Sequence, residues 1–160
     1  MSAYFKDKVV IVTGGTDGIG KALIEALLTM GAKVATCARN HDKLYQLQSE
    51  YPSSYLHTMV ADVSSYNDCK NFIESTIEVY GGIDILINNA GISMRALVKD
   101  LDVEVIEKVM DINFYGALYA TKYCLPEIAK NKGSIVGISS IAGFLGLPGR
   151  TGYSSSKFAL

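Results

Sequence analysis

Five short apolar runs, rich in β-branched residues, recur along the chain and are separated by longer segments of mixed polarity. The runs cover residues 8–13, 33–37, 55–61, 83–87 and 134–139. Continuous apolar runs of this length are typical of strands that are buried on both faces of a sheet. The pattern therefore predicts five buried strands.

The segments between these runs carry apolar residues every three or four positions, which predicts helices. The first predicted helix follows a glycine-rich turn, ends at Gly31 and places four apolar residues on one face: Ile19, Leu23, Leu27 and Met30. Further helices are predicted over residues 41–50 and 66–80. A long helical pattern over residues 102–130 contains Pro126, which predicts a kink or a break near that position.

Strands that alternate with helices in this way predict an α/β fold, a doubly wound parallel sheet with helices on both faces. For such a Rossmann-type sheet we expect the strand order 3-2-1-4-5. The sequence contains no internal repeat, low-complexity segment or linker. We therefore expect residues 1–160 to form a single domain.

Composition narrows the class of protein. Of the 160 residues, 49% are hydrophobic and 19% are charged, which is typical of a folded globular protein. A net charge of −1 with interspersed signs predicts no nucleic-acid partner. The three cysteines lack metal-ligand spacing, and His41 and His57 have no second ligand nearby in sequence, so we expect reduced thiols and no metal site. The start has no signal peptide and no run is long enough to span a membrane, which together predict a cytoplasmic location.

The turn after the first strand has three glycines in the pattern GxxxGxG: Gly14, Gly18 and Gly20. It lies between a strand and a helix, where a dinucleotide-binding turn belongs. Glycines there permit a tight turn and close approach of a pyrophosphate to the free amides of the helix N-terminus. The alternative is a tight turn that binds no ligand.

The end of the second strand predicts which dinucleotide is bound. An acidic residue that would hold a ribose 2′-hydroxyl is missing there, because Ala38 occupies its position and Arg39 follows. A guanidinium binds a 2′-phosphate through charge-assisted hydrogen bonds, and Lys43, one helical turn later, is placed to assist. We therefore favour NADP(H) over NAD(H). The alternative is an ordinary surface arginine.

A phenol and an ammonium occur together near the end of the sequence. If Tyr153 opens a helix, the four-residue spacing places it and Lys157 on one face, where the cation favours ionisation of the phenol. Ser140, thirteen residues before the tyrosine, is then placed to polarise a carbonyl that the tyrosine protonates. On spacing alone, an exposed surface pair is the more common explanation.

Taken in order, these motifs resemble the short-chain dehydrogenase/reductase family. The resemblance covers the chain from Lys8 to its end and rests on TGxxxGxG at 13–20, NNAG at 88–91, Asn113 in the long helix, Ser140 and YxxxK at 153–157. It implies an oxidoreductase that transfers a hydride between NADP(H) and a small carbonyl or secondary-alcohol substrate. It also implies that the full-length form is a homo-oligomer.

The resemblance implies a role for each matched residue. Asp62 would bond the adenine amino group, Val63 would flank it, and Asn89 would border the adenosine ribose. The whole set implied for the cofactor is Gly14, Thr16, Gly18, Ile19, Gly20, Arg39, Asp62, Val63, Asn89, Ala90, Tyr153 and Lys157.

Four residues are implied in catalysis. Asn113 would hold a proton-relay water, Ser140 would orient the substrate, Tyr153 would be the general acid/base, and Lys157 would bind the nicotinamide ribose. From composition alone, Asn113 is a solvated helix residue and Ser139 fits as well as Ser140. Four apolar residues flank the expected nicotinamide end and either line a substrate pocket or pack in the core: Met94, Ile141, Phe144 and Leu145.

Family members continue beyond the YxxxK helix with two further strands and a mobile substrate-binding segment, whereas this sequence ends at Leu160. We interpret it as the N-terminal portion of an enzyme; the alternatives are a non-catalytic nucleotide-binding fragment or scaffold, or an epimerase or dehydratase of the same fold. As an isolated piece it is expected to aggregate, because six apolar residues lose their cover: Ile106, Val109, Tyr119, Ile135, Val136 and Ile138.

Overall fold

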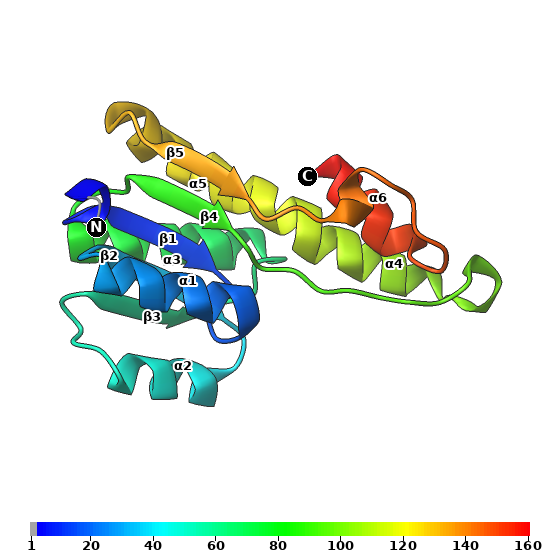
Figure 1. Cartoon of the computed structure of the whole chain (residues 1–160), viewed down its shortest axis with the longest axis horizontal. Helices are drawn as coiled ribbons and strands as arrows, with labels where there is room; N and C mark the ends of the chain where they lie inside the picture. Colours follow the sequence, from blue (N-terminus) through cyan, green and yellow to red (C-terminus); the bar gives the residue numbers. More distant parts are fainter. Residues whose placement is uncertain (1–2) are drawn as a thin grey trace.

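A five-stranded parallel sheet forms the centre of the computed structural model, which describes residues 3–160 (Figure 1). The strands are β1 Val9–Thr13, β2 Lys33–Ala38, β3 Leu56–Val60, β4 Ile85–Asn88 and β5 Ser134–Gly137. Their order is β3-β2-β1-β4-β5, and every adjacent pair is parallel. The predicted fold class and strand order are therefore confirmed, with strand ends displaced by at most two residues.

Six α-helices connect or follow the strands. They are α1 Gly18–Thr29, α2 His41–Ser49, α3 Tyr66–Tyr80, α4 Val103–Met110, α5 Gly116–Lys130 and α6 Thr151–Ala159. A π-helical segment, η3 Asp111–Tyr115, joins α4 to α5. Short 3₁₀ helices, which the sequence pattern does not predict, cover η1 Ala3–Phe5, η2 Val98–Asp100 and η4 Ile141–Gly143.

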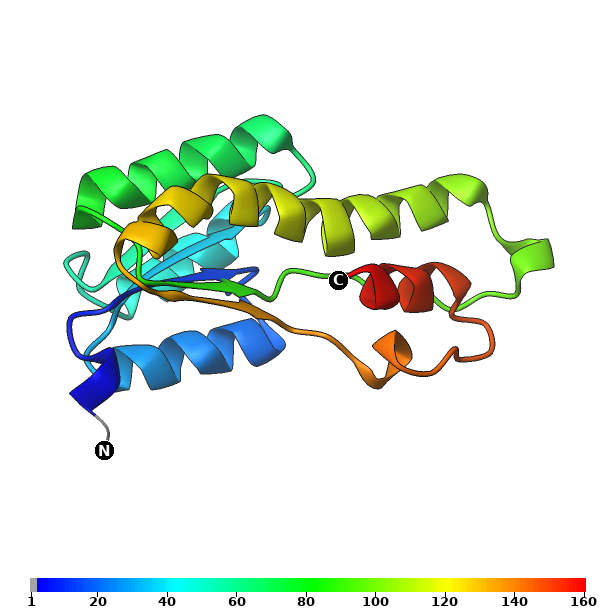
Figure 2. The same cartoon turned by 90° about the horizontal axis from the view of Figure 1, so that it is seen from above.

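Both faces of the sheet are covered, because successive strand residues point to opposite sides. In β1, Val10 and Val12 pack with residues of α1 and α2, including Ile24 and Leu47. Ile11, between them, packs on the other face with a cluster from α3 and α5: Phe72, Ile73, Ala120, Cys124 and Ile128. Figure 2 shows the two layers, with α1 on one side of the sheet and α3 and α5 on the other. This two-sided burial explains the continuous apolar runs.

The buried face of α1 differs from the predicted one. Gly20, Ile24 and Leu27 face the sheet, whereas Ile19 is 62% exposed and Met30 is exposed. The cause is Gly20, at which an added Cβ would overlap the Gly14 carbonyl oxygen. A glycine carries no hydrophobic signal, so the apolar pattern does not show that this side of the helix packs closest.

The long helix also differs from prediction. It runs without a break through Pro126, which lies exposed near the end of α5. Its irregularity is instead the π-helical segment, where the Gly116 N–H bonds the Asp111 carbonyl five residues earlier.

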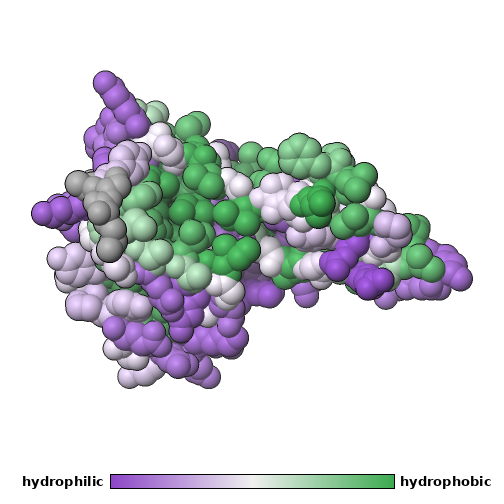
Figure 3. All heavy atoms as spheres, viewed as in Figure 1, coloured by the Kyte–Doolittle hydropathy of each residue, from purple (hydrophilic) through white to green (hydrophobic). Residues whose placement is uncertain are grey.

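Strand β5 lies at one edge of the sheet, and all four of its residues are exposed. Ile135 and Val136 are exposed as expected, and Figure 3 shows hydrophobic surface over the β4–β5 half of the sheet. Ile138 is partly buried against the core, and Val109 is only 1% exposed, because α4 packs against α6. The expected loss of cover at Val109 is therefore wrong.

Candidate active site

The carboxyl ends of β1 and β4 are tied together by Thr13 and Asn89. The Thr13 hydroxyl accepts hydrogen bonds from the backbone N–H groups of Asn89 and Ala90, both 3.1 Å long. The Asn89 amide donates to the carbonyls of Thr13 (2.9 Å) and Gly14 (3.1 Å). Gly14 has φ +71°, and a Cβ there would lie 2.9 Å from the Ala90 Cα. The first glycine of the turn is therefore required both by its φ angle and by this close packing.

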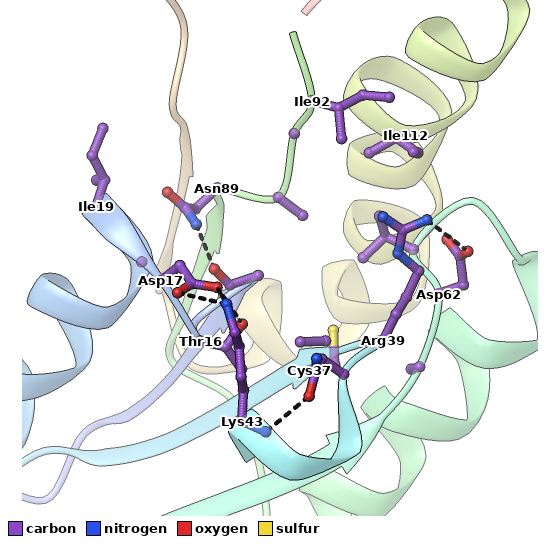
Figure 4. A pocket seen from close by; sticks show the side chains of 18 residues that line it. Thr16, Asp17, Ile19, Cys37, Arg39, Lys43, Asp62, Asn89, Ile92 and Ile112 are labelled. Carbon is purple, nitrogen blue, oxygen red and sulfur yellow. Dashed lines mark hydrogen bonds and ion pairs between the residues drawn. The ribbon is translucent and has the colours of Figure 1, made fainter. Parts of the chain in front are cut away.

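A cleft of about 480 Å³ opens at this edge of the sheet, a volume that suits a small-molecule or cofactor site (Figure 4). Nine of the residues implied for the cofactor line it: Gly14, Thr16, Ile19, Gly20, Arg39, Asp62, Val63, Asn89 and Ala90. Gly18 belongs to the same turn without lining the cleft, with φ +52°. Tyr153 and Lys157 do not line it either; they lie on α6.

Seven further residues that line the cleft are not among the site residues predicted from the sequence: Asp17, Cys37, Asn40, Ala61, Gly91, Ile92 and Ile112. Most are neighbours of motif residues, so their adjacency in sequence was an available signal. Ile112 has no such neighbour among the residues implied for the cofactor; the hydrogen bonds between the adjacent Asn113 and Ile92 hold η3 at the cleft. Burial raises the pKa of the Cys37 thiol to about 12, so this cleft cysteine is protonated near neutral pH.

Two cations face two carboxylates at the mouth of the cleft (Figure 4). The Lys43 ammonium lies 3.0 and 2.8 Å from the two Asp17 carboxylate oxygens, and its hydrogen bond lowers the pKa of Asp17. The Arg39 guanidinium lies 3.8 Å from Asp62. Partial burial raises the pKa of Asp62, but hydrogen bonds from Ser64 and the charge of Arg39 outweigh it, so the net shift is downward. Both carboxylates are therefore ionised at neutral pH.

The N-terminus of α1 points at this cleft with its amides unoccupied by a side-chain cap. Asp17 stands at the N-cap position, yet its carboxylate makes no capping hydrogen bond. The first N–H groups of a helix have no partner within the helix, and they carry the positive end of its dipole. This arrangement favours a phosphate group at the turn.

The second cluster lies where α4 and α6 project beyond the carboxyl ends of the strands (Figures 1 and 2). Its centre is Asn113 in η3, which is 1% exposed. The Asn113 side-chain oxygen accepts from the Ile92 N–H (2.8 Å), and its amide donates to the Ile92 carbonyl and to the Ser156 hydroxyl, each at 2.9 Å. These bonds exclude a solvated asparagine. They also connect Ile92, which lines the cleft, to α6.

Helix α6 carries the tyrosine and the lysine. It begins at Thr151, two residues before Tyr153, and the Ser156 hydroxyl donates to the Tyr153 carbonyl at 2.8 Å. The Lys157 ammonium donates to the Ile138 carbonyl just beyond β5, at 2.7 Å. Lys157 is 7% exposed, and this burial lowers its pKa. An exposed surface lysine is therefore excluded at this position.

Ser140 lies at the start of η4, where its hydroxyl accepts from the Ala142 N–H at 3.2 Å. The hydroxyl of Ser139 faces Gly143, at which an added Cβ would lie 2.8 Å from it. Of the four flanking apolar residues, Met94 is buried, whereas the others are strongly exposed: Ile141, Phe144 and Leu145. Core packing therefore explains Met94 but not the three exposed residues.

Arg150 was not identified from the sequence. Its guanidinium donates to the Ser93 hydroxyl and lies 5.8 Å from the centre of the Tyr153 ring. Ser93 follows the NNAG motif by two residues, so Arg150 joins that segment to the start of α6. A single arginine between two motifs carries no periodic signal that would have revealed this contact.

A membrane-spanning helix is not found among residues 3–160, because none of their helices combines sufficient length with sufficient apolar character.

The comparisons with known proteins agree with this geometry. A family model described as short chain dehydrogenase matches residues 8–160. A dehydrogenase/reductase SDR family protein 7-like of Anopheles gambiae is 36% identical over 98% of this chain and 52% of its own length. An 11-beta-hydroxysteroid dehydrogenase-like 2 of Arabidopsis thaliana is 38% identical over 96% of this chain and 51% of its own length. This chain thus spans about half the length of these relatives.

A solved structure supports the same assignment. The crystal structure of a short-chain dehydrogenase from Streptomyces avermitilis matches with a TM-score of 0.91 and 29% sequence identity. The match covers 96% of this chain and 57% of that one. With the family model matching almost the whole sequence, the chain belongs to the short-chain dehydrogenase family.

Proposed function

We propose that this chain supplies the cofactor site and the acid/base residues of an NADP(H)-dependent oxidoreductase that interconverts a carbonyl and a secondary alcohol. The observation that carries the proposal is the hydrogen-bonded connection from the cleft, through Ile92 and Asn113, to Ser156 on the helix of Tyr153 and Lys157. It supports a binding site and a proton donor that serve one reaction.

The residues present fit a dinucleotide. The cleft has a suitable volume, the α1 N-terminus offers uncapped amides for a pyrophosphate, and Arg39 offers a cation at the cleft mouth. Val63 and Ile112 both line the cleft and provide apolar contacts of the kind that a planar base requires.

The chemistry that a bound nicotinamide would supply here is hydride transfer to the carbonyl carbon, or from the alcohol carbon in the reverse direction. In the reductive direction Tyr153 gives its phenolic proton to the carbonyl oxygen, which becomes the hydroxyl of the alcohol. The Lys157 ammonium stabilises the phenolate that remains, since one of its three N–H groups is held by Ile138 and two stay available. Ser140 orients the carbonyl oxygen.

The preference for NADP(H) rests on Arg39. Its side chain is 56% exposed at the cleft mouth, and Ala38 supplies no carboxylate to accept a ribose 2′-hydroxyl. Arg39→Ala is expected to weaken NADP(H) by about 1 to 3 kcal/mol, the usual size of a charge-assisted hydrogen bond, and to leave NAD(H) nearly unchanged. Calorimetric titration with both dinucleotides measures this, and Arg95→Ala, outside the cleft, is the control. An equal loss for both dinucleotides would contradict the preference.

The substrate is proposed to have a hydrophobic body. Phe144 is 86% exposed and Leu145 is 59% exposed, and both follow η4, which packs against α6. Exposed apolar side chains beside the proposed proton donor favour a substrate that covers them.

Tyr153→Phe tests the reaction. The variant keeps the ring and removes only the transferable proton, so we expect turnover of a ketone panel to fall by about 10²-fold or more while dinucleotide binding stays within two-fold. Tyr45→Phe removes the same atom at an exposed position of α2 and serves as the matched control. Turnover that survives in Tyr153→Phe would refute the acid/base role. A native protein that binds dinucleotide without any turnover would favour a binding module, and turnover without net cofactor consumption would favour an epimerase or dehydratase.

A further inference from the structure

The two ion pairs at the cleft mouth differ in strength. Lys43 reaches both oxygens of Asp17, at 2.8 and 3.0 Å, which are hydrogen-bond distances. Arg39 lies 3.8 Å from Asp62, beyond the length of a hydrogen bond. One cation is therefore engaged by its carboxylate, while the other is only loosely held.

Asp17 is committed to Lys43 by the local structure. The carboxylate does not cap α1, and its other side-chain contact is a long 3.4 Å hydrogen bond from the Thr16 hydroxyl. Lys43 is anchored at its backbone, where its N–H donates to the Asn40 side chain at 2.9 Å. The Lys43 side chain therefore extends from the first turn of α2 across to the turn between β1 and α1 (Figure 4).

We propose that Asp17 withholds Lys43 from the 2′-phosphate of the cofactor and thereby limits the preference for NADP(H). The inference rests on the proposed function and makes Asp17 a positioning residue that acts through Lys43. In the native protein Arg39 alone would then be free to contact the 2′-phosphate.

The charges at the mouth agree with this assignment. Two carboxylates and two cations cancel, so an incoming 2′-phosphate meets no net positive charge from these four groups. Neutralising Asp17 frees the Lys43 ammonium and leaves a net charge of +1. Because both side chains of the pair are half-exposed or more, at 50% and 68%, solvent screens the interaction and the effect is modest.

A double-mutant cycle on the purified protein tests the inference, with NADP⁺ and NAD⁺ as the titrated probes. Asp17→Asn keeps the shape of the side chain and is expected to tighten NADP⁺ by about three- to five-fold, the range set by an exposed ion pair, with NAD⁺ changed less than about two-fold. Lys43→Met alone is expected to change NADP⁺ less than about two-fold, since its ammonium is already engaged. In the double variant the tightening disappears.

Asp42→Asn is the matched control, because it removes one exposed negative charge from the first turn of α2 without touching Lys43. If Asp17→Asn tightens NADP⁺ equally with Lys43→Met present, Asp17 acts by direct repulsion and the inference is overturned. It is also overturned if Lys43→Met weakens NADP⁺ as strongly in the native background as with Asp17→Asn. These binding measurements do not depend on turnover, so the inference can fail while the acid/base proposal stands; a native protein that binds neither dinucleotide overturns both.

Discussion

The cleft and the cluster on α6 are held in different ways. The cleft is formed at the ends of β1 and β2, central strands paired on both sides, and the Thr13–Asn89 bonds fix its floor. The α6 cluster lies beyond the carboxyl end of the exposed edge strand β5, and a few side-chain bonds position it, chiefly those of Asn113 and Lys157. The proposed dinucleotide site thus depends on the sheet itself, and the proposed reactive groups depend on a few contacts outside it. Substitutions at the α6 cluster should therefore lower turnover without changing dinucleotide affinity, and substitutions at the cleft should lower dinucleotide affinity.

The largest difference between the effects on turnover and on dinucleotide affinity is expected from Gly143→Ala. A Cβ at Gly143 would lie 2.6 Å from the Lys157 carbonyl oxygen, so η4 must move away from α6. Displacing reacting groups by about 1 Å costs on the order of 10²-fold in rate, and we expect kcat to fall by that amount while dinucleotide affinity stays within two-fold. Steady-state kinetics and a binding titration measure the two quantities. Gly146→Ala, where no atom lies within 4 Å of an added Cβ, is the control. Parallel losses in rate and affinity would argue against separate regions.

Gly20→Ala, at the cleft, is expected to act mainly on dinucleotide affinity. An added Cβ would overlap the Gly14 carbonyl oxygen and lie 2.6 Å from the Asn89 side-chain nitrogen. Overpacking costs about 1–3 kcal/mol, so both dinucleotides should bind about ten-fold more weakly or worse, and thermal stability should fall. Because the cleft floor is common to both cofactors, a loss confined to NADP(H) would show that the turn is not held in this way.

The smallest expected effect concerns His57, near the start of the edge strand β3. His57 is half-buried with its Nε2 atom 3.0 Å from the Ser75 hydroxyl, and burial lowers its pKa. The unfolded histidine, with a pKa of about 6.5, takes up a proton first, so the free energy of unfolding is fully present above that pH and declines as the pH falls below it. His57→Gln should flatten this decline in denaturant melts at several pH values. His41→Gln, on an exposed histidine, should not.

Sequence reasoning succeeded where the signal was local. Buried strands show as apolar runs, and the strand order follows from their alternation with helices. Predictions from the sequence are wrong or missing where contacts between separate elements determine the structure. The buried face of α1 depends on Gly20, which has no side chain to be counted as apolar. Ile112 reaches the cleft only because η3 packs there, and the pairing of Asp17 with Lys43 joins the turn before α1 to the first turn of α2. Patterns within one element do not report such contacts between elements.

The π-helical segment has a consequence for the angular phase of the long helix. A π turn adds a residue to the helical repeat, so α4 and α5 are rotated relative to one another by about 100° compared with an uninterrupted α-helix. That offset lets one continuous helix present Ile106 toward Gly152 of α6 and Cys124 toward the sheet. Deleting a single residue from Asp111–Tyr115 would leave the hydrogen bonding more regular, yet it would turn α4 out of phase and carry the YxxxK helix away from the cleft. The π-helical segment therefore sets the rotation of α4 relative to α5, and the position of α6 relative to the cleft depends on that rotation.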